Sequence, residues 1–466
     1  MAVRRVLKAS AGIGPDHPKR LWCHFIWGLT LRPDVCDTLQ PNAGPSKAIS
    51  GRNLRQMVPA RQRVDWLEAN PAVTYSYAEP EWRQVMTNRR SIFEDVAQQA
   101  PASMAAAGGL IDTPTGRGRE VIRLWLVLLF GLVVLMILVG GLTRLTDSGL
   151  SITEWRPVTG AVPPLRAQDW RLEFDKYQTI PEYQLQNKGM TLSEFKVIYW
   201  WEWGHRQLGR VIGLVWAIGF LGLLLSGSMP RGWALRLFTI GALGGVQGAV
   251  GWWMVSSGLT GSMLDVASYR LATHLGLAFV ILGFITWFVL LLSRPDRDLM
   301  QARRQREAPL VWLATILVPL AFIQVIMGAL VAGIDAGRNY IDWPLMAGGI
   351  LPPDLFSLEP WWRNFFEDDG LVQFVHRTAG YILFLFGAFV WWRARSSANT
   401  GVRMCFHLVM GMMLLQMVLG IVTVMHSAPW DLAIIHQLGA ILLWVLILQA
   451  RFRAGHPTAQ SVRGSI

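Results

Sequence analysis

The sequence predicts an all-α polytopic membrane protein with eight transmembrane helices. Of its 466 residues, 52% are hydrophobic and only 16% are charged, whereas a soluble domain usually carries about 25% charged residues. Apolar runs of about 20 residues recur along the chain, and each is long enough to cross a bilayer core as a helix. The hydrophobic content excludes a disordered chain, and the 3 Cys exclude a disulfide scaffold.

The expected spans follow these apolar runs in chain order. They are 121–142, 205–226, 234–255, 270–292, 309–333, 372–392, 403–425 and 431–450. Arg residues gather in the loops on one side, such as 293–308, whereas the opposite short loops 256–269 and 426–430 carry no Lys or Arg. By the positive-inside rule both termini are cytoplasmic. Much of the net charge of +12 therefore marks topology, and no nucleic-acid partner is expected.

Residues 1–103 differ in composition from the rest. They are rich in Pro, Gly and charged residues and contain no apolar run long enough to span a membrane. We interpret them as a disordered extension or as sequence before a mis-assigned start, because Met104 opens a plausible alternative beginning; a small regulatory tail is the alternative. Residues 104–120 are expected to form a cytoplasmic N-terminal segment.

Motifs recur in the same order in two halves of the chain. The His-Arg pair that opens the second span recurs where the sixth opens, and a Gln-x-x-x-Gly motif at 247–251 recurs at 416–420. Because each half has an even number of spans, the copies are parallel repeats. The sequence thus predicts two tandem four-helix bundles related by a pseudo-two-fold axis along the membrane normal. The expected parts are a first repeat at 121–292, a cytoplasmic linker at 293–308, a second repeat at 309–451 and a cytoplasmic tail at 452–466.

Four of the nine His lie on the even-numbered spans, near the start of each. Even-numbered spans run from outside to inside, so all four His are expected near the outer face of the bilayer. A lone membrane His usually makes an interhelical hydrogen bond, but four in a two-by-two pattern indicate paired metal ligation. The expected pairs are His205 with His274 and His376 with His436.

Haem iron suits these pairs better than zinc or copper. Zinc would require further Cys or carboxylate ligands, and copper usually brings Cys or Met close by. Two imidazoles from facing helices are typical haem ligands. Gly209 and Gly380, one turn after their His, would let a flat macrocycle approach the helix. Arg206 and Arg377 are candidate contacts for haem propionates, although interfacial snorkelling explains them equally well.

The halves differ three residues before the first His of each pair. Glu202 precedes His205, whereas Gln373 precedes His376. Residues i and i+3 share a helix face, so each side chain is expected to face its own metal centre. Glu can exchange a proton or stabilise a cation and Gln cannot, which makes Glu202 the candidate catalytic residue. The three Trp around Glu202 are expected to give it an apolar setting; an interfacial Trp belt with an incidental carboxylate is the alternative.

Four strings stand out along the chain: Thr146–Trp155, Pro157–Pro164, Glu202–Arg206 and Gly333–Pro344. They resemble the haem A synthase family, in its alphaproteobacterial and mitochondrial branch, and the resemblance covers about residues 115–455. It implies an oxidoreductase that converts a methyl group of haem O to a formyl group in successive steps, with the oxygen atom from water. The product is haem A for cytochrome oxidase.

The resemblance also implies roles for the His pairs. His376 and His436 would be the axial ligands of a haem b cofactor, and His205 and His274 would bind the substrate haem O. Glu202 matches the family's essential glutamate and would stabilise a cation or handle the proton of incoming water. Some relatives carry a Cys pair in the first outer loop, which this chain lacks.

The implied setting is the bacterial inner membrane, with the haem sites toward the periplasm. Expected partners are the lipid bilayer, haem O synthase, cytochrome oxidase assembly factors, an external electron carrier and a second copy in a homo-oligomer. Two rival functions stay open from the residues alone: a di-haem b-type electron-transfer cytochrome, and a transporter whose His line a path.

Overall fold

A computed structural model of the protein describes residues 116–259, 261 and 263–460. The extension 1–103 and most of the expected segment 104–120 lie outside the described residues. Within the described part the chain is helical, with one isolated β-bridge between Met346 and Gly349 and no strand. Eight of these helices are long and apolar enough to cross a membrane. They are α3 (Gly116–Leu145), α6 (Leu192–Leu225), α7 (Ala234–Val255), α8 (Ser268–Leu292), α10 (Ala308–Gly333), α12 (Asp369–Ala394), α13 (Thr400–Met425) and α14 (Trp430–Gly455). The prediction of an all-α, eight-span protein is confirmed.

The helix α6 is longer than the expected span. It begins 205 − 192 = 13 residues earlier, at Leu192. Thr191 caps this end by accepting a hydrogen bond from the Glu194 backbone N–H, while the Glu194 carboxylate accepts from the Thr191 N–H. Its 34 residues correspond to about 50 Å of helix, against about 30 Å for the hydrocarbon core. Helix α6 therefore projects beyond the membrane, and His205 lies along it rather than at its start.

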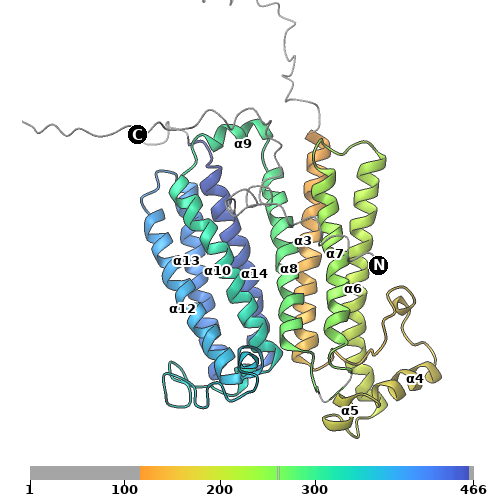
Figure 1. Cartoon of the computed structure of the whole chain (residues 1–466). Coiled ribbons are helices and arrows are strands. Elements are labelled where there is room, and N and C mark those ends of the chain that lie inside the picture. The colour runs from red at the N-terminus through yellow and green to blue at the C-terminus, as the bar shows by residue number, and fades with distance from the viewer. Residues whose placement is uncertain (1–115, 260, 262, 461–466) are drawn as a thin grey trace, which may run out of the picture. The chain divides into compact units, whose positions relative to one another are not determined.

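The long helices pack as two rings of four (Figure 1). In the first ring α3, α6, α7 and α8 each contact two neighbours, and α10, α12, α13 and α14 do the same in the second. The rings meet through α8 with α10, α3 with α14, and α8 with α14. These contacts map onto one another when α3 is exchanged with α10 and α8 with α14, as a two-fold relation requires. The axis itself remains a prediction.

The main hydrophobic cluster includes the place where the two rings meet. Leu126 of α3, Leu282 of α8, Ala314 of α10 and Ile447 of α14 are fully buried there. Large apolar side chains on the outer faces of the helices, such as Leu225, are exposed. Exposed leucines of this kind suit contact with lipid tails, so the buried and exposed apolar surfaces agree with a multi-pass membrane protein.

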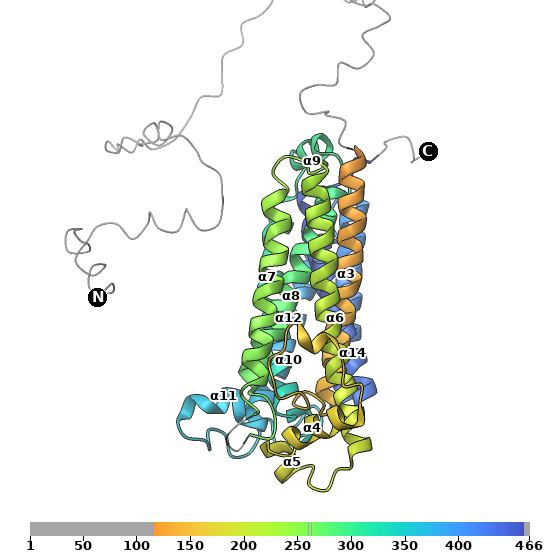
Figure 2. The ribbon, with the colours of Figure 1, turned by 90° about the vertical axis from the view of Figure 1, so that its right-hand side faces the viewer.

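Short helices and loops lie at one end of the rings (Figure 2). The shorter elements there are η3 (Thr159–Ala161), α4 (Ala167–Tyr177), α5 (Pro181–Leu185), η4 (Ala336–Arg338), η5 (Trp361–Arg363) and α11 (Asn364–Glu367), while α9 (Asp296–Arg303) lies in the linker at the opposite end. Helices α4 and α5 pack on the projecting end of α6 through a separate apolar cluster that includes Tyr177, Phe195 and Tyr199. We call α4, α5 and the loops that join them to α3 and α6 the outer layer of the first half.

Candidate functional site

Each of the four predicted ligands packs against a glycine on the preceding long helix of its ring. A Cβ built on that glycine would lie about 3 Å from the Cε1 atom of the imidazole, at or near the closest approach that side chains make. A larger residue would therefore press on the ring or displace it. The pairs are His205 with Gly140 (2.8 Å), His274 with Gly251 (2.9 Å), His376 with Gly328 (3.1 Å) and His436 with Gly420 (3.0 Å).

The members of each predicted pair lie on two helices of one ring. His205 is on α6 and His274 on α8, and His376 is on α12 and His436 on α14. In each ring these two helices stand opposite one another rather than side by side. Ligation of one metal by both imidazoles of a pair stays a prediction.

Three of the four imidazoles have a ring nitrogen without a hydrogen-bond partner. The Nδ1 atoms of His205, His274 and His436 are buried without a hydrogen-bond partner. Among the described residues no group of three or more His, Cys, Asp and Glu side chains is gathered for a metal ion. Two imidazoles in a glycine-lined ring suit a planar group with axial ligation, as haem requires.

Glutamines hold three of the four histidine turns. The Nε2 of Gln247 donates to the His274 carbonyl (3.0 Å) and that of Gln416 to the His436 carbonyl (2.7 Å). Gln324 donates likewise to the His376 carbonyl (3.1 Å). In the first half, Met136 stands where Gln324 stands in the second. The Cε atom of Met136 lies 3.2 Å from a Cβ built on Gly209, and the Nε2 atom of Gln324 lies 3.2 Å from a Cβ built on the matching Gly380.

Gly209 and Gly380 thus face side chains of the neighbouring helix, and the glycines that contact the imidazoles are others. Sequence reasoning missed those four glycines. Gly251 and Gly420 close the repeated Gln-x-x-x-Gly motif, so a signal for two of them was present.

Glu202 is buried, with 3% of its surface exposed, and both carboxylate oxygens are bonded. Oε2 accepts hydrogen bonds from the Ser151 hydroxyl (2.7 Å) and the Ile152 backbone N–H (2.7 Å). Oε1 accepts from Arg206, at 2.6 Å from Nη2 and 3.1 Å from Nε. The loop after α3 and the next turn of α6 therefore hold the carboxylate in one position.

The expected apolar setting of three Trp is only partly present. Trp200 and Trp201 are exposed, at 45% and 37%, and Trp203 is half-buried. Consecutive residues on a helix point in different directions, so they cannot all enclose one side chain. The groups that contact Glu202 are polar, and sequence reasoning did not identify Ser151 among them.

Gln373 occupies the matching place in the second half. It is 2% exposed, and its Nε2 donates to the Ala336 carbonyl at 2.8 Å. Its Oε1 is buried without a partner. The second pocket therefore offers a neutral amide where the first offers a carboxylate beside Arg206.

Arg206 and Arg377 tie an outer loop to their helix. Arg206 donates to the carbonyls of Ile152 (2.8 Å) and Glu154 (3.1 Å). Arg377 donates to those of Tyr340 (2.8 Å) and Asp342 (3.0 Å). A role in binding propionates stays a prediction.

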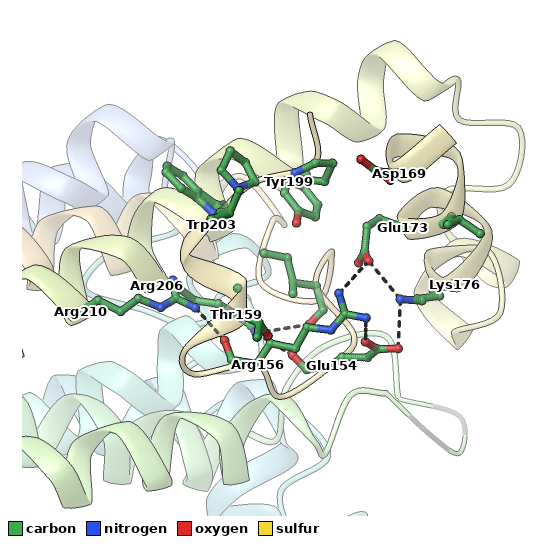
Figure 3. Close-up of a pocket in the computed structure, with 16 residues that line it drawn as sticks. Glu154, Arg156, Thr159, Asp169, Glu173, Lys176, Tyr199, Trp203, Arg206 and Arg210 are labelled. Atoms are coloured by element: carbon green, nitrogen blue, oxygen red, sulfur yellow. Dashed lines mark hydrogen bonds and ion pairs between the residues drawn. The ribbon is translucent and has the colours of Figure 1, made fainter. Parts of the chain in front are cut away.

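A cavity of about 310 Å³ opens beside Arg206 at the outer layer (Figure 3). Lys176 bridges Glu154 (3.1 Å) and Glu173 (3.0 Å), and Arg156 contacts both carboxylates. The hydrogen bond from Lys176, with the charge of Arg156, lowers the pKa of Glu154 despite an opposing contribution from burial. Sequence reasoning did not identify this ion cluster.

Comparison with known proteins places the chain in a family. Residues 123–448 match the family described as cytochrome oxidase assembly protein (COX15-CtaA). A protein of Dinoroseobacter shibae named heme A synthase is 63% identical over 382 residues, which cover 82% of this chain and 100% of that protein. Proteins of the same name from Ruegeria pomeroyi and Jannaschia sp. are 61% and 57% identical over 381 residues each; both alignments cover 100% of the relative, and 81% and 82% of this chain. The chain belongs to the haem A synthase family of cytochrome oxidase assembly proteins.

Proposed function

We propose that this protein is a haem A synthase, which oxidises a methyl group of haem O to a formyl group and so supplies haem A for cytochrome oxidase. Its relatives carry that name, and the alignments with this chain cover their full length. The observation that carries the proposal within the molecule is the contrast between the matching positions of the two four-helix rings. One has the buried carboxylate of Glu202 three residues before its first His, and the other has the amide of Gln373.

The first half is the proposed substrate side. His205 and His274 bind the iron of haem O there, in the ring that also contains Glu202. His376 and His436 would hold haem b in the second half. When bound, haem b would supply one-electron transfer. The two imidazoles that each ring provides, each packed against a glycine, support a haem in each half.

Conversion of a methyl to a formyl group consumes one water molecule and releases four electrons and four protons. The electrons leave to a separate one-electron redox protein. The reaction passes through an alcohol and a hydrated aldehyde, with the oxygen atom from water. Glu202 stabilises positive charge on the substrate or takes the proton of incoming water, and its hydrogen bonds from Ser151 and Ile152 fix the carboxylate for either task.

The proposed setting is the bacterial inner membrane, with both termini in the cytoplasm and the haem sites toward the periplasm. Haem O synthase and cytochrome oxidase assembly factors are the proposed partners, because one makes the substrate and the others use the product. Arg206 and Arg377 are proposed to lie near haem propionates.

The second candidate function is a di-haem b-type electron-transfer cytochrome. The near-equivalence of the two His pairs favours it, because in such a cytochrome both haems would only transfer electrons. The carboxylate of Glu202 in one half alone would then have no role in the reaction. Extraction of the pigments from the purified protein separates the two. A synthase yields haem O or haem A beside haem B, an electron-transfer cytochrome yields haem B alone, and a transporter yields none.

A further inference from the structure

Three of the four predicted haem ligands are held by a glutamine of their own ring, and the fourth, His205, is not. Met136 takes that place beside His205, and its thioether donates no hydrogen bond. A glutamine of the other half, Gln437, reaches helix α3 instead. It lies on α14 and directly follows His436. A residue of the second half thus contacts the helix that packs behind a ligand of the first.

Gln437 contacts the turn of α3 that carries Gly140. Its Nε2 donates to the Ile137 carbonyl at 2.7 Å, and a Cβ built on Gly141 would collide with its Oε1. These two contacts lie on either side of Gly140 along the chain. Gly140 is the residue against which the His205 imidazole packs, with 2.8 Å from a built Cβ to Cε1. The amide of Gln437 therefore fixes the helix surface on which this imidazole rests.

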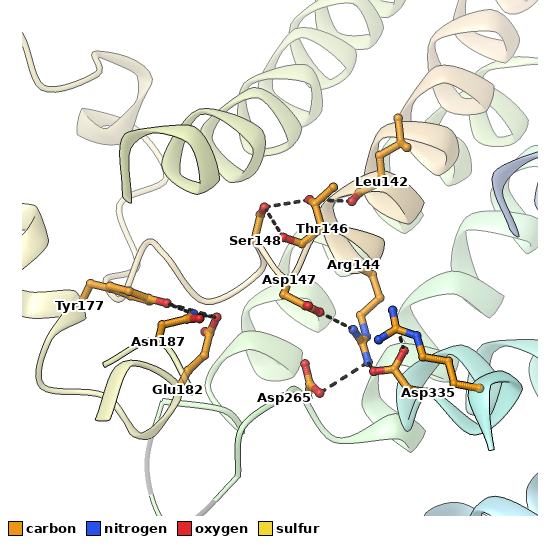
Figure 4. Close-up of polar contacts among 11 residues, drawn as sticks. Leu142, Arg144, Thr146, Asp147, Ser148, Tyr177, Glu182, Asn187, Asp265 and Asp335 are labelled. Atoms are coloured by element: carbon orange, nitrogen blue, oxygen red, sulfur yellow. Dashed lines mark hydrogen bonds and ion pairs between the residues drawn. The ribbon is translucent and has the colours of Figure 1, made fainter. Parts of the chain in front are cut away.

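Both ends of this contact are themselves fixed. On α14, Gln416 donates to the His436 carbonyl at 2.7 Å, so the turn that carries Gln437 is held within the second half. On α3, Arg144 pairs with Asp335 of the second half at 2.9 Å (Figure 4), near the same end of the helix. Helix α3 is attached to the second half at both of these points, and Gln437 provides the one beside the ligand.

The matching contact on the other side of the interface is apolar. Leu275 directly follows His274 on α8, and it packs against an apolar cluster that includes Ala329 of α10. Ala329 matches Gly141, since each directly follows a glycine that contacts an imidazole. A leucine side chain forms no hydrogen bond, so at these two matching places the polar contact runs from the second half to the first. The ligand without a glutamine of its own ring is the one supported from across the interface.

We propose that Gln437, although it lies in the second half, positions His205 in the first. This inference rests on the proposed function, in which the first half binds haem O. Gln437 fixes the α3 turn, the turn fixes the orientation of the His205 imidazole, and the imidazole sets where the substrate lies relative to Glu202. Misplacement of a reacting group by about 1 Å costs about 100-fold in rate. Gln437 acts through α3 and is a positioning residue.

The test measures the haem of each half separately in the purified full chain, with haem b as the probe. His205→Ala and His376→Ala each remove a ligand from one half, so their spectra identify which ferric haem signal belongs to which site. Gln437→Met keeps a side chain of similar length and removes the N–H donor. It should shift the electron paramagnetic resonance signal of the first-half haem and speed the loss of that haem by about three- to tenfold, as expected for one hydrogen bond. The second-half haem should keep its signal and its rate of loss.

A role confined to the second half makes the opposite prediction. If Gln437 merely supports the neighbouring His436, then Gln437→Met alters the second-half signal and leaves the first-half signal unchanged, and that result overturns the proposal. Leu275→Met, at the matching place, is the control, because volume-conserving apolar exchanges are well tolerated. It should change neither signal.

Gly141→Ala provides a second route to the same change. The added Cβ occupies the place where the Gln437 amide packs, so this variant should shift the first-half signal as Gln437→Met does. Because both changes remove one contact, the double variant should show no larger effect than either change alone. Additive effects would mean that the two residues act independently, which contradicts the positioning role.

Haem A formation separates this inference from the proposed function. In membranes supplied with haem O and an artificial electron acceptor, Gln437→Met should form haem A about tenfold more slowly than the wild type. Two haem signals and the expected shift, without haem A formation by the wild type, support the positioning role and contradict the proposed function. Haem A formation with an unshifted first-half signal in Gln437→Met contradicts the positioning role alone. If neither half binds haem, both proposals fail.

Discussion

The two halves of the molecule share a scaffold and differ in the groups placed on it. In each half, two histidines come from opposite helices of the four-helix ring, and each imidazole packs against a glycine of a neighbouring helix. Around the first histidine of each pair the side chains change. Glu202 and Met136 stand in one half where Gln373 and Gln324 stand in the other.

Under the proposed function, this difference is what separates the half that holds haem b from the half that oxidises haem O. In the second half, Gln324 donates to the turn that carries His376, and Gln373 is a neutral amide. In the first half a methionine gives the His205 turn no such bond, and a carboxylate lies one turn away. Changes confined to helix faces beside the ligands are thus enough to make two similar pockets chemically different, without a change of fold.

The largest expected effect is the exchange of acid and amide. Glu202→Gln should lower haem A formation by about 100-fold or more, because the amide carries no charge and exchanges no proton, while haem binding persists. Haem extraction and the absorption spectrum of the purified variant measure both.

The reverse change, Gln373→Glu, should lower haem A formation by less than tenfold. If both exchanges reduce haem A formation equally, the assignment of substrate and cofactor sides is wrong. Full haem A formation in Glu202→Gln removes the catalytic role of this residue.

Substitution of a glycine that contacts an imidazole should weaken haem binding only in the half that contains it. A Cβ at Gly140 meets the His205 ring at 2.8 Å, and overpacking of this kind costs about 1–3 kcal/mol. Gly140→Ala should therefore weaken haem binding in the first half by about 10–100-fold, and Gly328→Ala should do the same in the second.

Titration of each variant with haem, followed by the Soret band, measures the remaining sites. Gly131→Ala is the matched control on α3, because a Cβ there meets nothing within 4 Å. Loss of both haems in Gly140→Ala would mean that the two pockets do not bind independently.

A smaller effect is expected from the methionine and glutamine beside the first ligands. Gln324→Met removes a hydrogen bond worth about 1 kcal/mol and should speed haem loss from the second half by about three- to tenfold. Met136→Gln should slow haem loss from the first half by a similar factor.

Transfer of haem to an apo-globin scavenger measures both rates. Leu138→Gln is the control for a new polar group on α3, since Leu138 packs in the hydrophobic core instead. Equal haem loss from wild type and Gln324→Met would show that the glutamine does not retain the cofactor.

The smallest effect should come from the ion cluster of the outer layer. Lys176→Met removes two ion pairs from Glu154 and Glu173, and partly exposed pairs contribute about 1 kcal/mol or less. Hydrogen exchange in 152–177 should rise a few-fold, with no change in haem A formation. Lys188→Met, an exposed residue of the same layer, should change neither; a large loss of activity in Lys176→Met would give the cluster a part in the reaction.

The repeated features of the sequence predicted the spans and the candidate residues. The features that depend on contacts between distant segments were missed. Apolar runs predicted the eight spans, and the two-by-two histidines and the contrast between Glu202 and Gln373 predicted the elements of the site. The length of α6 was missed because residues 192–204 are amphiphilic rather than apolar, although the Thr191–Glu194 capping box marked its start. Ser151 was missed because it reaches Glu202 from an irregular loop, where spacing carries no information about contact.

The way in which Arg206 and Arg377 hold their loops has a consequence for variation. Both arginines donate to main-chain carbonyls, at Ile152 and Glu154 in one half and at Tyr340 and Asp342 in the other. A main-chain carbonyl is present whatever the side chain, so the loop residues are free to change while the attachment persists. Each half can thus acquire its own outer surface, and with it its own neighbours, while the pocket beneath stays in register.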